Sequence, residues 1–238
     1  MKKLLLIIAL SGIFQVGVQA QAALFALIFG DKVATENFNV GLEIGFPYGT
    51  VSDFNGNSSN LGLHFGIGAN VRFNDNWSLN PAAYFLSTRG ADLDALSLNS
   101  ADTELNGKFQ AVPATLRTNF IDVPVFLNYR FTDSNFKIGL APQISFRTRS
   151  NAIFSNEFGD FDYDIADQTA STDFGLITQL GYIWNSENKN LEVHIQLRYF
   201  QGFADVYDDT LVSGENNMRY FSLSLSFPFV KKSESTDE

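Results

Sequence analysis

Apolar and polar side chains alternate without interruption from Leu61 to Phe73, and this alternation constrains the fold more than any other feature of the chain. One parity carries Leu, Phe, Ile, Ala and Val, whereas the other carries Gly, His, Asn and Arg. Successive side chains of a β-strand point to opposite faces, so the pattern predicts a long strand with one apolar face. Similar patterns occur at 40–46, 77–85, 121–131, 136–147, 173–184, 191–199 and 220–229. We therefore expect an all-β chain with one antiparallel sheet of about eight strands.

The predicted connections alternate between two length classes. Short ones are 74–76, 132–135 and 185–190, and long ones are 47–60, 88–115, 150–172 and 202–217. Short periplasmic turns alternating with long extracellular loops are typical of an up-and-down barrel in the outer membrane. The rhythm predicts a transmembrane antiparallel β-barrel of this kind.

The direction of the apolar parity decides between a membrane barrel and a soluble one. The chain has 24 Phe among 238 residues, yet its mean hydropathy is only −0.02, so apolar and polar residues are interleaved. The interior of an eight-stranded barrel is just wide enough for side chains to fill, and it could not hold most of these large residues. We therefore expect the apolar parity to face lipid, with glycines and charges inside. Aromatic residues beside the short turns fit a membrane interface: Phe73, Trp77, Phe131, Phe136 and Trp184.

The N-terminus is typical of an export signal. Lys2 and Lys3 precede the apolar run 4–14, and 18–20 has the small-x-small pattern of a cleavage site. The predicted divisions are a signal peptide at 1–20, an N-terminal periplasmic segment at 21–37, an outer-membrane barrel at 38–229 and a polar periplasmic tail at 230–238. The apolar run 22–29 has no place in this strand count.

Composition excludes several classes of function. There is no cysteine, which removes disulfides, thiolate metal sites and thiol nucleophiles. The net charge of −10 becomes −10 − 2 = −12 without Lys2 and Lys3, which argues against a nucleic-acid partner.

Charged residues of both signs fall on the parity expected to point inward. Because buried charges need partners, we predict a structural network of ion pairs that fills the barrel, with a narrow polar conduit as the alternative. Its predicted members are Glu43, Arg72, Asp122, Arg130, Lys137, Arg147, Asp173, Glu192, Arg198 and Arg219.

Other candidate sites are weaker. Strand direction predicts His64 near the extracellular end of its strand and His194 nearer the periplasmic end of its own, and neither lies in a hydrolase motif. Asp160, Asp162, Asp164 and Asp167 have spacing similar to a calcium loop, but Ile165 occupies the position that needs glycine. We expect satisfied interior imidazoles and a solvated acidic loop, with weak divalent binding as the alternative. No catalytic, cofactor or metal residue is predicted.

The segment Ile121–Phe131, with Pro124 between branched aliphatic residues, resembles the mid-barrel strand of the PorT-like outer-membrane β-barrel family. The resemblance covers most of the chain from the first strand to Phe229. It implies an outer-membrane location and, for some members, assistance to protein secretion. The Val40–Gly45 start and the polar tail depart from the family pattern.

Together these patterns predict an exported, non-enzymatic outer-membrane barrel with a role in surface interaction or envelope structure. Its expected partners are outer-membrane lipid and lipopolysaccharide, the barrel-insertion machinery, and an extracellular or secretion-system protein. Two alternatives remain: a barrel enzyme acting on lipid or peptide, and a soluble secreted barrel that binds a small ligand.

Overall fold

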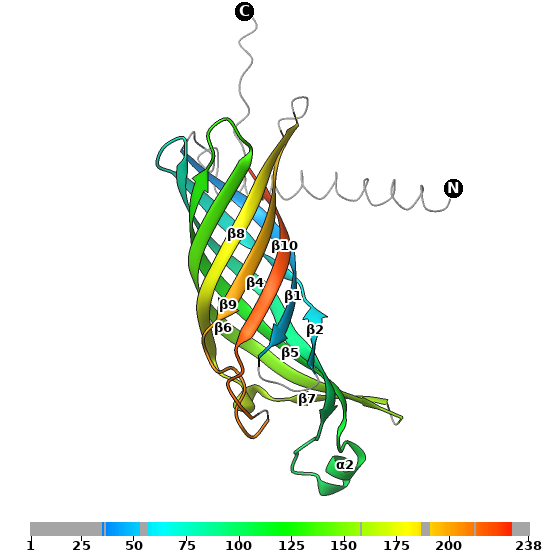
Figure 1. The fold of residues 1–238 in the computed structure, drawn as a ribbon. Coiled ribbons are helices and arrows are strands. Elements are labelled where there is room, and N and C mark those ends of the chain that lie inside the picture. The colour runs from blue at the N-terminus through cyan, green and yellow to red at the C-terminus, as the bar shows by residue number, and fades with distance from the viewer. Residues whose placement is uncertain are drawn as a thin grey trace, which may run out of the picture.

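In the computed structural model the chain forms a β-barrel whose strands are tilted relative to the barrel axis (Figure 1). The structure describes residues 35, 37–52, 57–157, 159–186, 191–211 and 213–229. The predicted signal peptide, the run 22–29 and the polar tail lie outside the described residues. The elements are β1 (Phe38–Val51), β2 (Asn57–Leu61), β3 (His64–Arg72), β4 (Trp77–Leu96), α2 (Thr103–Lys108), β5 (Val112–Arg130), β6 (Phe136–Asn156), β7 (Gly159–Asp164), η2 (Ala166–Gln168), β8 (Thr172–Ser186), β9 (Leu191–Gly202) and β10 (Met218–Pro228).

Eight antiparallel strands close the barrel in the order β1, β3, β4, β5, β6, β8, β9, β10. The ring closes where β10 pairs with β1, from Gly41 opposite Pro228 to Val51 opposite Met218. Of the two remaining strands, β2 continues the wall beyond β3 and pairs with both β1 and β4, whereas β7 lies outside the ring and pairs with β6. The predicted eight-stranded barrel is confirmed.

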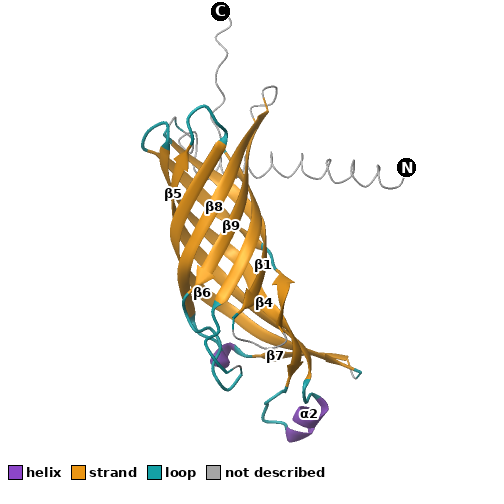
Figure 2. Cartoon of the chain, viewed as in Figure 1, coloured by secondary structure: helices purple, strands orange, loops and turns teal. Residues whose placement is uncertain are grey.

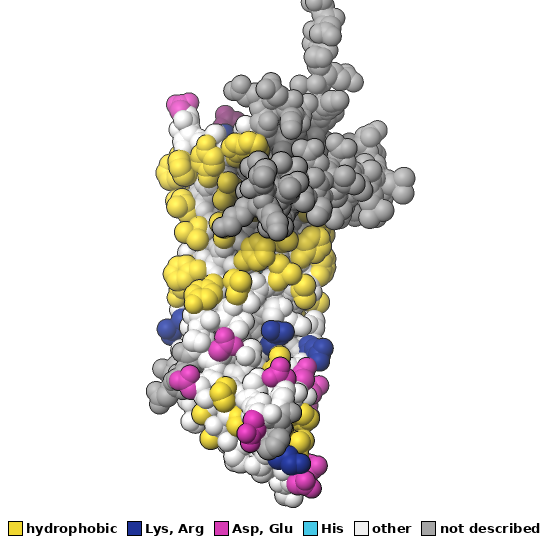
Figure 3. Space-filling view, turned by 90° about the vertical axis from the view of Figure 1, so that its right-hand side faces the viewer, with side chains coloured by type: hydrophobic (Ala, Val, Ile, Leu, Met, Phe, Trp, Pro, Cys, Tyr) yellow, Lys and Arg dark blue, Asp and Glu magenta, His cyan; other side chains and the backbone are white. Residues whose placement is uncertain are grey.

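The large apolar side chains face outward, as the sequence predicts. Phe65, Leu127 and Leu180 are exposed on the outer wall, with exposed fractions of 39%, 46% and 50%, whereas Gln179 beside Leu180 is buried. Figure 3 shows hydrophobic side chains gathered over the short-turn part of the molecule and charged side chains gathered towards the long-loop end. The outer wall is therefore suited to hydrocarbon at one end and to water at the other.

Three of the four long connections are shorter than predicted, because the strands continue past the apolar belt, whereas the connection before β10 keeps its predicted length. β4 extends to Leu96 and β5 begins at Val112, so both ends of the predicted loop 88–115 are sheet. The predicted loop 150–172 likewise holds the end of β6, all of β7 and η2. The first strand runs to Val51. Figure 2 shows these extensions projecting beyond the barrel, with α2 at the far end.

The extensions and the loop before β10 form what we call the head, residues 91–116, 151–171 and 203–217, of which 158 and 212 are not described. The head has an apolar core inside the sheet that includes Leu93, Phe109, Leu116, Phe154 and Val206. Among the described residues no helix is long and apolar enough to cross a membrane.

Candidate functional site

The interior of the barrel is filled by side chains in successive layers from the short-turn end to the head. Crowding is greatest where glycine stands on the inward parity: a Cβ added at Gly45 would overlap the ring of His64, and one at Gly139 would overlap the amide of Asn128. Glycine at these positions lets longer polar side chains from neighbouring strands occupy the axis.

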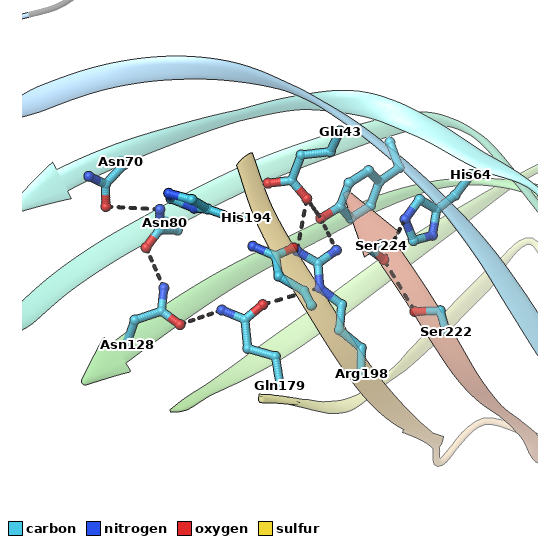
Figure 4. Close-up of polar contacts among 12 residues, drawn as sticks. Glu43, His64, Asn70, Asn80, Asn128, Gln179, His194, Arg198, Ser222 and Ser224 are labelled. Carbon is cyan, nitrogen blue, oxygen red and sulfur yellow. Dashed lines mark hydrogen bonds and ion pairs between the residues drawn. The ribbon is translucent and has the colours of Figure 1, made fainter. Parts of the chain in front are cut away.

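The middle layer is built around Arg198 of β9, whose side chain is almost completely buried. Its guanidinium donates to Glu43 Oε2 at 2.8 Å and to the Tyr84 hydroxyl at 2.5 Å. Tyr84 in turn donates to Glu43 Oε2 at 2.7 Å. Figure 4 shows the group bridging strands on different sides of the barrel. The Arg198 guanidinium carbon also lies 4.9 Å from the centre of the Phe126 ring. The buried charge is therefore paired, hydrogen-bonded and stacked, as a charge in a low-dielectric interior requires.

A chain of amides continues from Arg198 towards the short turns (Figure 4). Arg198 Nε donates to Gln179 at 3.1 Å, Gln179 donates to Asn128, and Asn128 donates to Asn80. Asn80 donates to Asn70 at 3.0 Å. The cavities described along this region have volumes of only about 20 Å³ and 50 Å³. A bonded amide ladder therefore occupies much of the space that a conduit would need.

The layer at the short-turn mouth brings four predicted network residues into one polar pocket. Lys137 Nζ lies 3.1 Å from His194 Nδ1, and His194 Nε2 lies 2.6 Å from Glu192 Oε1. Arg72 and Arg130 line the same cavity of about 50 Å³. His194 was predicted towards the periplasmic end, and this is where it lies.

The layer below the head holds a buried charge cluster around Arg89, which the sequence analysis did not include. Arg89 bonds Asp122 at 2.6 Å and Asp173 at 3.3 Å, and all three side chains are buried. Its guanidinium carbon also lies 4.1 Å from the centre of the Phe120 ring. The pattern of 88–115 predicts a loop, so it gives Arg89 no inward position. The inward parity of Asp122 and Asp173, two carboxylates that each need a cation partner, was the signal that could have found it.

Two of the predicted network residues lie elsewhere. Arg219 is exposed on the outer side of β10 between the buried side chains of Met218 and Tyr220, so its inward assignment was wrong. Arg219 and Phe221 are two residues apart and therefore point to the same face of β10. The alternation of the strand is thus consistent with an outward Arg219. Arg147 lies at the rim, where its Nε donates to the carbonyl of Ala170 at 3.2 Å.

The two histidines occupy separate layers. His64 stacks on Tyr84, with ring centres 4.6 Å apart, and lies 3.1 Å from the Ser224 hydroxyl. It is buried, and its other neighbours are the Arg198 layer rather than an open cleft. His64 and His194 therefore have the partners expected of structural imidazoles.

The head closes the other end of the interior and carries its own polar surface. Between the charge cluster and the apolar core, Thr118, Ser150 and Tyr207 form a buried hydrogen-bonded group, with 2.8 Å between the two smaller hydroxyls and 3.1 Å from Thr118 to Tyr207. Burial raises the pKa of the Tyr207 phenol to about 12. The Tyr207 hydroxyl therefore stays protonated at physiological pH.

A pocket of about 400 Å³ opens on the surface of the head between the η2 turn and the loop before β10. Its acidic lining residues are Asp167, Asp205, Asp208 and Asp209. The backbone N–H of Thr210 lowers the pKa of the Asp208 carboxyl. The calcium-loop spacing noted at 160–167 does not form a loop, because 160–164 belongs to β7.

With the closed barrel and its filled interior established, the family can be assigned. A family model described as an outer membrane protein beta-barrel domain matches residues 19–208. The chain belongs to this family. It is an outer-membrane protein, so the short turns face the periplasm and the head faces the outside of the cell. The alternative of a soluble secreted barrel is wrong.

Solved barrels of similar architecture are distant in sequence. The match to Ail of Yersinia pestis has 13% sequence identity, covers 82% of this chain and 100% of the Ail chain, and gives a TM-score of 0.40. OprG of Pseudomonas aeruginosa is 14% identical, covers 82% of this chain and 95% of that chain, and gives 0.42. Neisserial surface protein A is 16% identical, with coverages of 81% and 97% and a score of 0.40. No match was found among curated proteins.

Proposed function

We propose that this protein is a non-enzymatic barrel that acts through its extracellular head, as a surface-interaction protein of the outer membrane. The observation that carries the proposal is the contrast between the two ends. The interior is filled by bonded layers around Arg198 and Arg89, whereas the head is a folded, water-exposed unit beyond the apolar belt. Binding residues are commonly carried on loops that a rigid scaffold positions.

The charge of the head indicates the chemistry of its partner. Acidic side chains outnumber basic ones on its described surface, and the acidic residues are Asp92, Asp94, Asp102, Glu104, Glu157, Asp160, Asp162, Asp164, Asp167, Asp205, Asp208, Asp209 and Glu215. An anionic surface attracts cationic groups and repels anionic ones. We therefore favour a protein partner with a basic surface, while lipid and lipopolysaccharide contact the belt below.

The resemblance of Ile121–Phe131 to PorT-like barrels supports a finer version of the same proposal, in which the partner belongs to a secretion system. The barrel-insertion machinery is a further proposed partner, through the aromatic-ended strand β10. A barrel enzyme is the less favoured function, because both histidines bond to interior partners and neither faces the pocket on the head.

The absence of cysteine from the chain allows a direct test of orientation and access. A single cysteine at Asp209→Cys, on the head, is expected to react with a membrane-impermeant maleimide in intact cells. The matched variant Asp133→Cys, in the turn between β5 and β6, is expected to react only after the outer membrane is opened. The reverse pattern would refute the proposal.

Planar-bilayer recording supplies the second test. The purified barrel is expected to give no steady open channel, because the Arg198 and Arg89 layers fill the interior. Steady conductance in the wild-type protein would favour the polar conduit over the surface-interaction role.

A further inference from the structure

β7 (Gly159–Asp164) is the outermost strand on one side of the head. It pairs with β6 from Asn151 opposite Asp164 to Asn156 opposite Gly159. Within the part of the chain that the structure describes, no strand pairs with its other edge. Figure 1 shows the β6–β7 pair reaching sideways from the barrel at the head end. A strand in this position carries a row of backbone groups available to another chain.

The pairing identifies which backbone groups are available. The N–H of Ile165 donates to the carbonyl of Ser150 at 3.0 Å. Opposed residues of an antiparallel pair alternate between bonded and non-bonded positions, so Tyr163 and Phe161 direct their backbone groups to β6. Asp160, Asp162 and Asp164 direct theirs to the open edge.

The side chains of β7 also alternate. Phe161 and Tyr163 are half-buried against the head core, with the Phe161 ring centre 5.4 Å from that of Phe109. The three aspartates are exposed on the opposite face. Asp162 lies 3.6 Å from the exposed Arg149, and Asp160 accepts a 2.8 Å hydrogen bond from Ser155. Asp162 also accepts a hydrogen bond from the Asn151 amide, and Asp164 accepts one from the backbone N–H of Ala166 at 2.7 Å. The open edge therefore combines available backbone groups with a row of exposed carboxylates, of which only Asp162 has a cation partner among the described residues.

We propose that the open edge of β7 binds an extended, lysine- or arginine-rich segment of another protein, which adds to the head as a further strand. The inference rests on the proposed surface-interaction function and names the chemistry of its partner. Backbone hydrogen bonds to an added strand supply affinity, and side chains on alternate residues supply specificity. A segment with basic residues on every second position would place its charges opposite the aspartates.

Charge also argues against a second copy as the occupant. Two β7 edges paired antiparallel would bring their aspartate rows together, and like charges opposed across a pair are destabilising. The acidic surface of the surrounding head disfavours an anionic polysaccharide or lipid phosphate for the same reason. A cationic protein segment is the occupant that the charges favour.

The test uses the full barrel in nanodiscs of phosphatidylcholine and the fluorescent peptide Lys-Val-Lys-Val-Lys-Val, with binding read by anisotropy. The control peptide has the same composition but D-valine, so that it keeps the charge and cannot form a regular strand. We expect the all-L peptide to bind at least about tenfold more tightly than the control, since only it can form the backbone ladder. Equal binding of the two peptides, or no binding of either, would overturn the proposal.

Substitutions separate backbone pairing from charge. Asp162→Pro removes the same carboxylate as Asp162→Asn and also an edge donor that β6 does not use, and proline is tolerated at an edge whose N–H faces solvent. Peptide binding should therefore fall about tenfold or more below that of Asp162→Asn while the barrel stays folded. Asp160→Asn with Asp162→Asn should weaken binding and reduce its salt dependence. The matched pair Asp208→Asn with Asp209→Asn removes the same charge from the loop before β10 and should have little effect. Equal losses from the two aspartate pairs would show attraction to the head in general and refute a β7 site.

The peptide control keeps the proposal testable even where Asp162→Pro fails to fold, because it leaves the protein unchanged. The maleimide experiment separates the two proposals. Surface labelling of the head without strand-specific peptide binding would leave the proposed function standing and remove the β7 site. A head labelled only from the periplasm would remove the proposed function itself.

Discussion

Arg198 shows how a narrow barrel accommodates a buried charge. Its guanidinium meets a carboxylate, a phenol and an amide from different strands, so several strands are tied together across the axis. A buried ion pair adds little net stability relative to an apolar pair of the same shape, but removal of one partner leaves an uncompensated charge. The arrangement is thus sensitive to single substitutions and tolerant of paired ones.

Arg198→Met is expected to destabilise the barrel by about 3–5 kcal/mol, because Glu43 keeps a buried charge without its cation. The measurement is urea unfolding in lipid vesicles, followed by the fluorescence of Trp77 and Trp184. Adding Glu43→Gln should recover part of the loss, with a coupling energy of about 1–3 kcal/mol. Strict additivity of the two substitutions would contradict the pairing.

Arg89 and Arg219 form a second residue-scale comparison, since one is buried with two carboxylates and the other faces outward. Arg89→Met should cost about 3–5 kcal/mol because Asp122 and Asp173 lose their shared cation. Arg219→Met should change the unfolding free energy by less than about 0.5 kcal/mol, as for most exposed positions. The same urea titration measures both unfolding free energies. A large loss of unfolding free energy in Arg219→Met would contradict the outward position of Arg219.

At the scale of the elements, β4, β5 and β6 invert their polarity along their length. Leu127 and Leu140 face lipid in the membrane part, but in the head Leu116 and Phe154 face inward. The strands therefore change from a pattern suited to hydrocarbon outside to one suited to water outside. β-bulges between Tyr84 and Ser87 and between Leu93 and Leu96 add further shifts of register.

This inversion explains what could and could not be predicted from the sequence. The eight ring strands follow from period-two alternation in which the apolar face is continuous and long. The head strands alternate in the opposite sense over short stretches that bulges interrupt, so 88–115 resembles a loop. Arg89 was lost with that segment, whereas Glu43 and Arg198 were found because they lie on well-patterned strands. Which inward charges bond to which depends on register, and a sequence pattern fixes parity but not register.

Phe154→Ala tests whether the head is a separate cooperative unit. The buried ring is lost from the apolar core, which should cost the head about 3–5 kcal/mol. We expect faster hydrogen exchange within 91–116 and 151–164 and unchanged exchange in the membrane parts of β8 and β9, since regions of one protein can open independently. Ile153→Ala, on the outward side of the same strand, is the matched control. A uniform change across the barrel would show that the head and ring unfold together.

For the molecule as a whole, the outward apolar belt and the filled interior have the same cause: in the membrane part, the parity with the large apolar side chains faces outward and the polar parity faces inward. The interior of a ring of eight strands has room for glycines, amides, paired charges and a few rings such as Phe126 and Phe200, but not for the large side chains of the whole apolar parity as well. The large residues therefore lie on the outer wall, where they match lipid, and the interior has little space left for a solute. The head supplies the water-exposed surface that the membrane part lacks.

The depth dependence of a charge on the outer wall tests this arrangement. Leu180 lies midway along the outward row of β8 between Phe174 and Trp184, whereas Phe136 lies beside a short turn. Leu180→Arg should cost about 2–4 kcal/mol, as arginine does at the bilayer midplane, and Phe136→Arg about 1 kcal/mol or less from charge burial. The measurement is urea unfolding in vesicles, with heat-modifiable migration on gels as the check of folding. Similar small effects at both positions would mean that water surrounds this wall, because only a hydrocarbon layer makes the cost of a charge depend on its height along a strand.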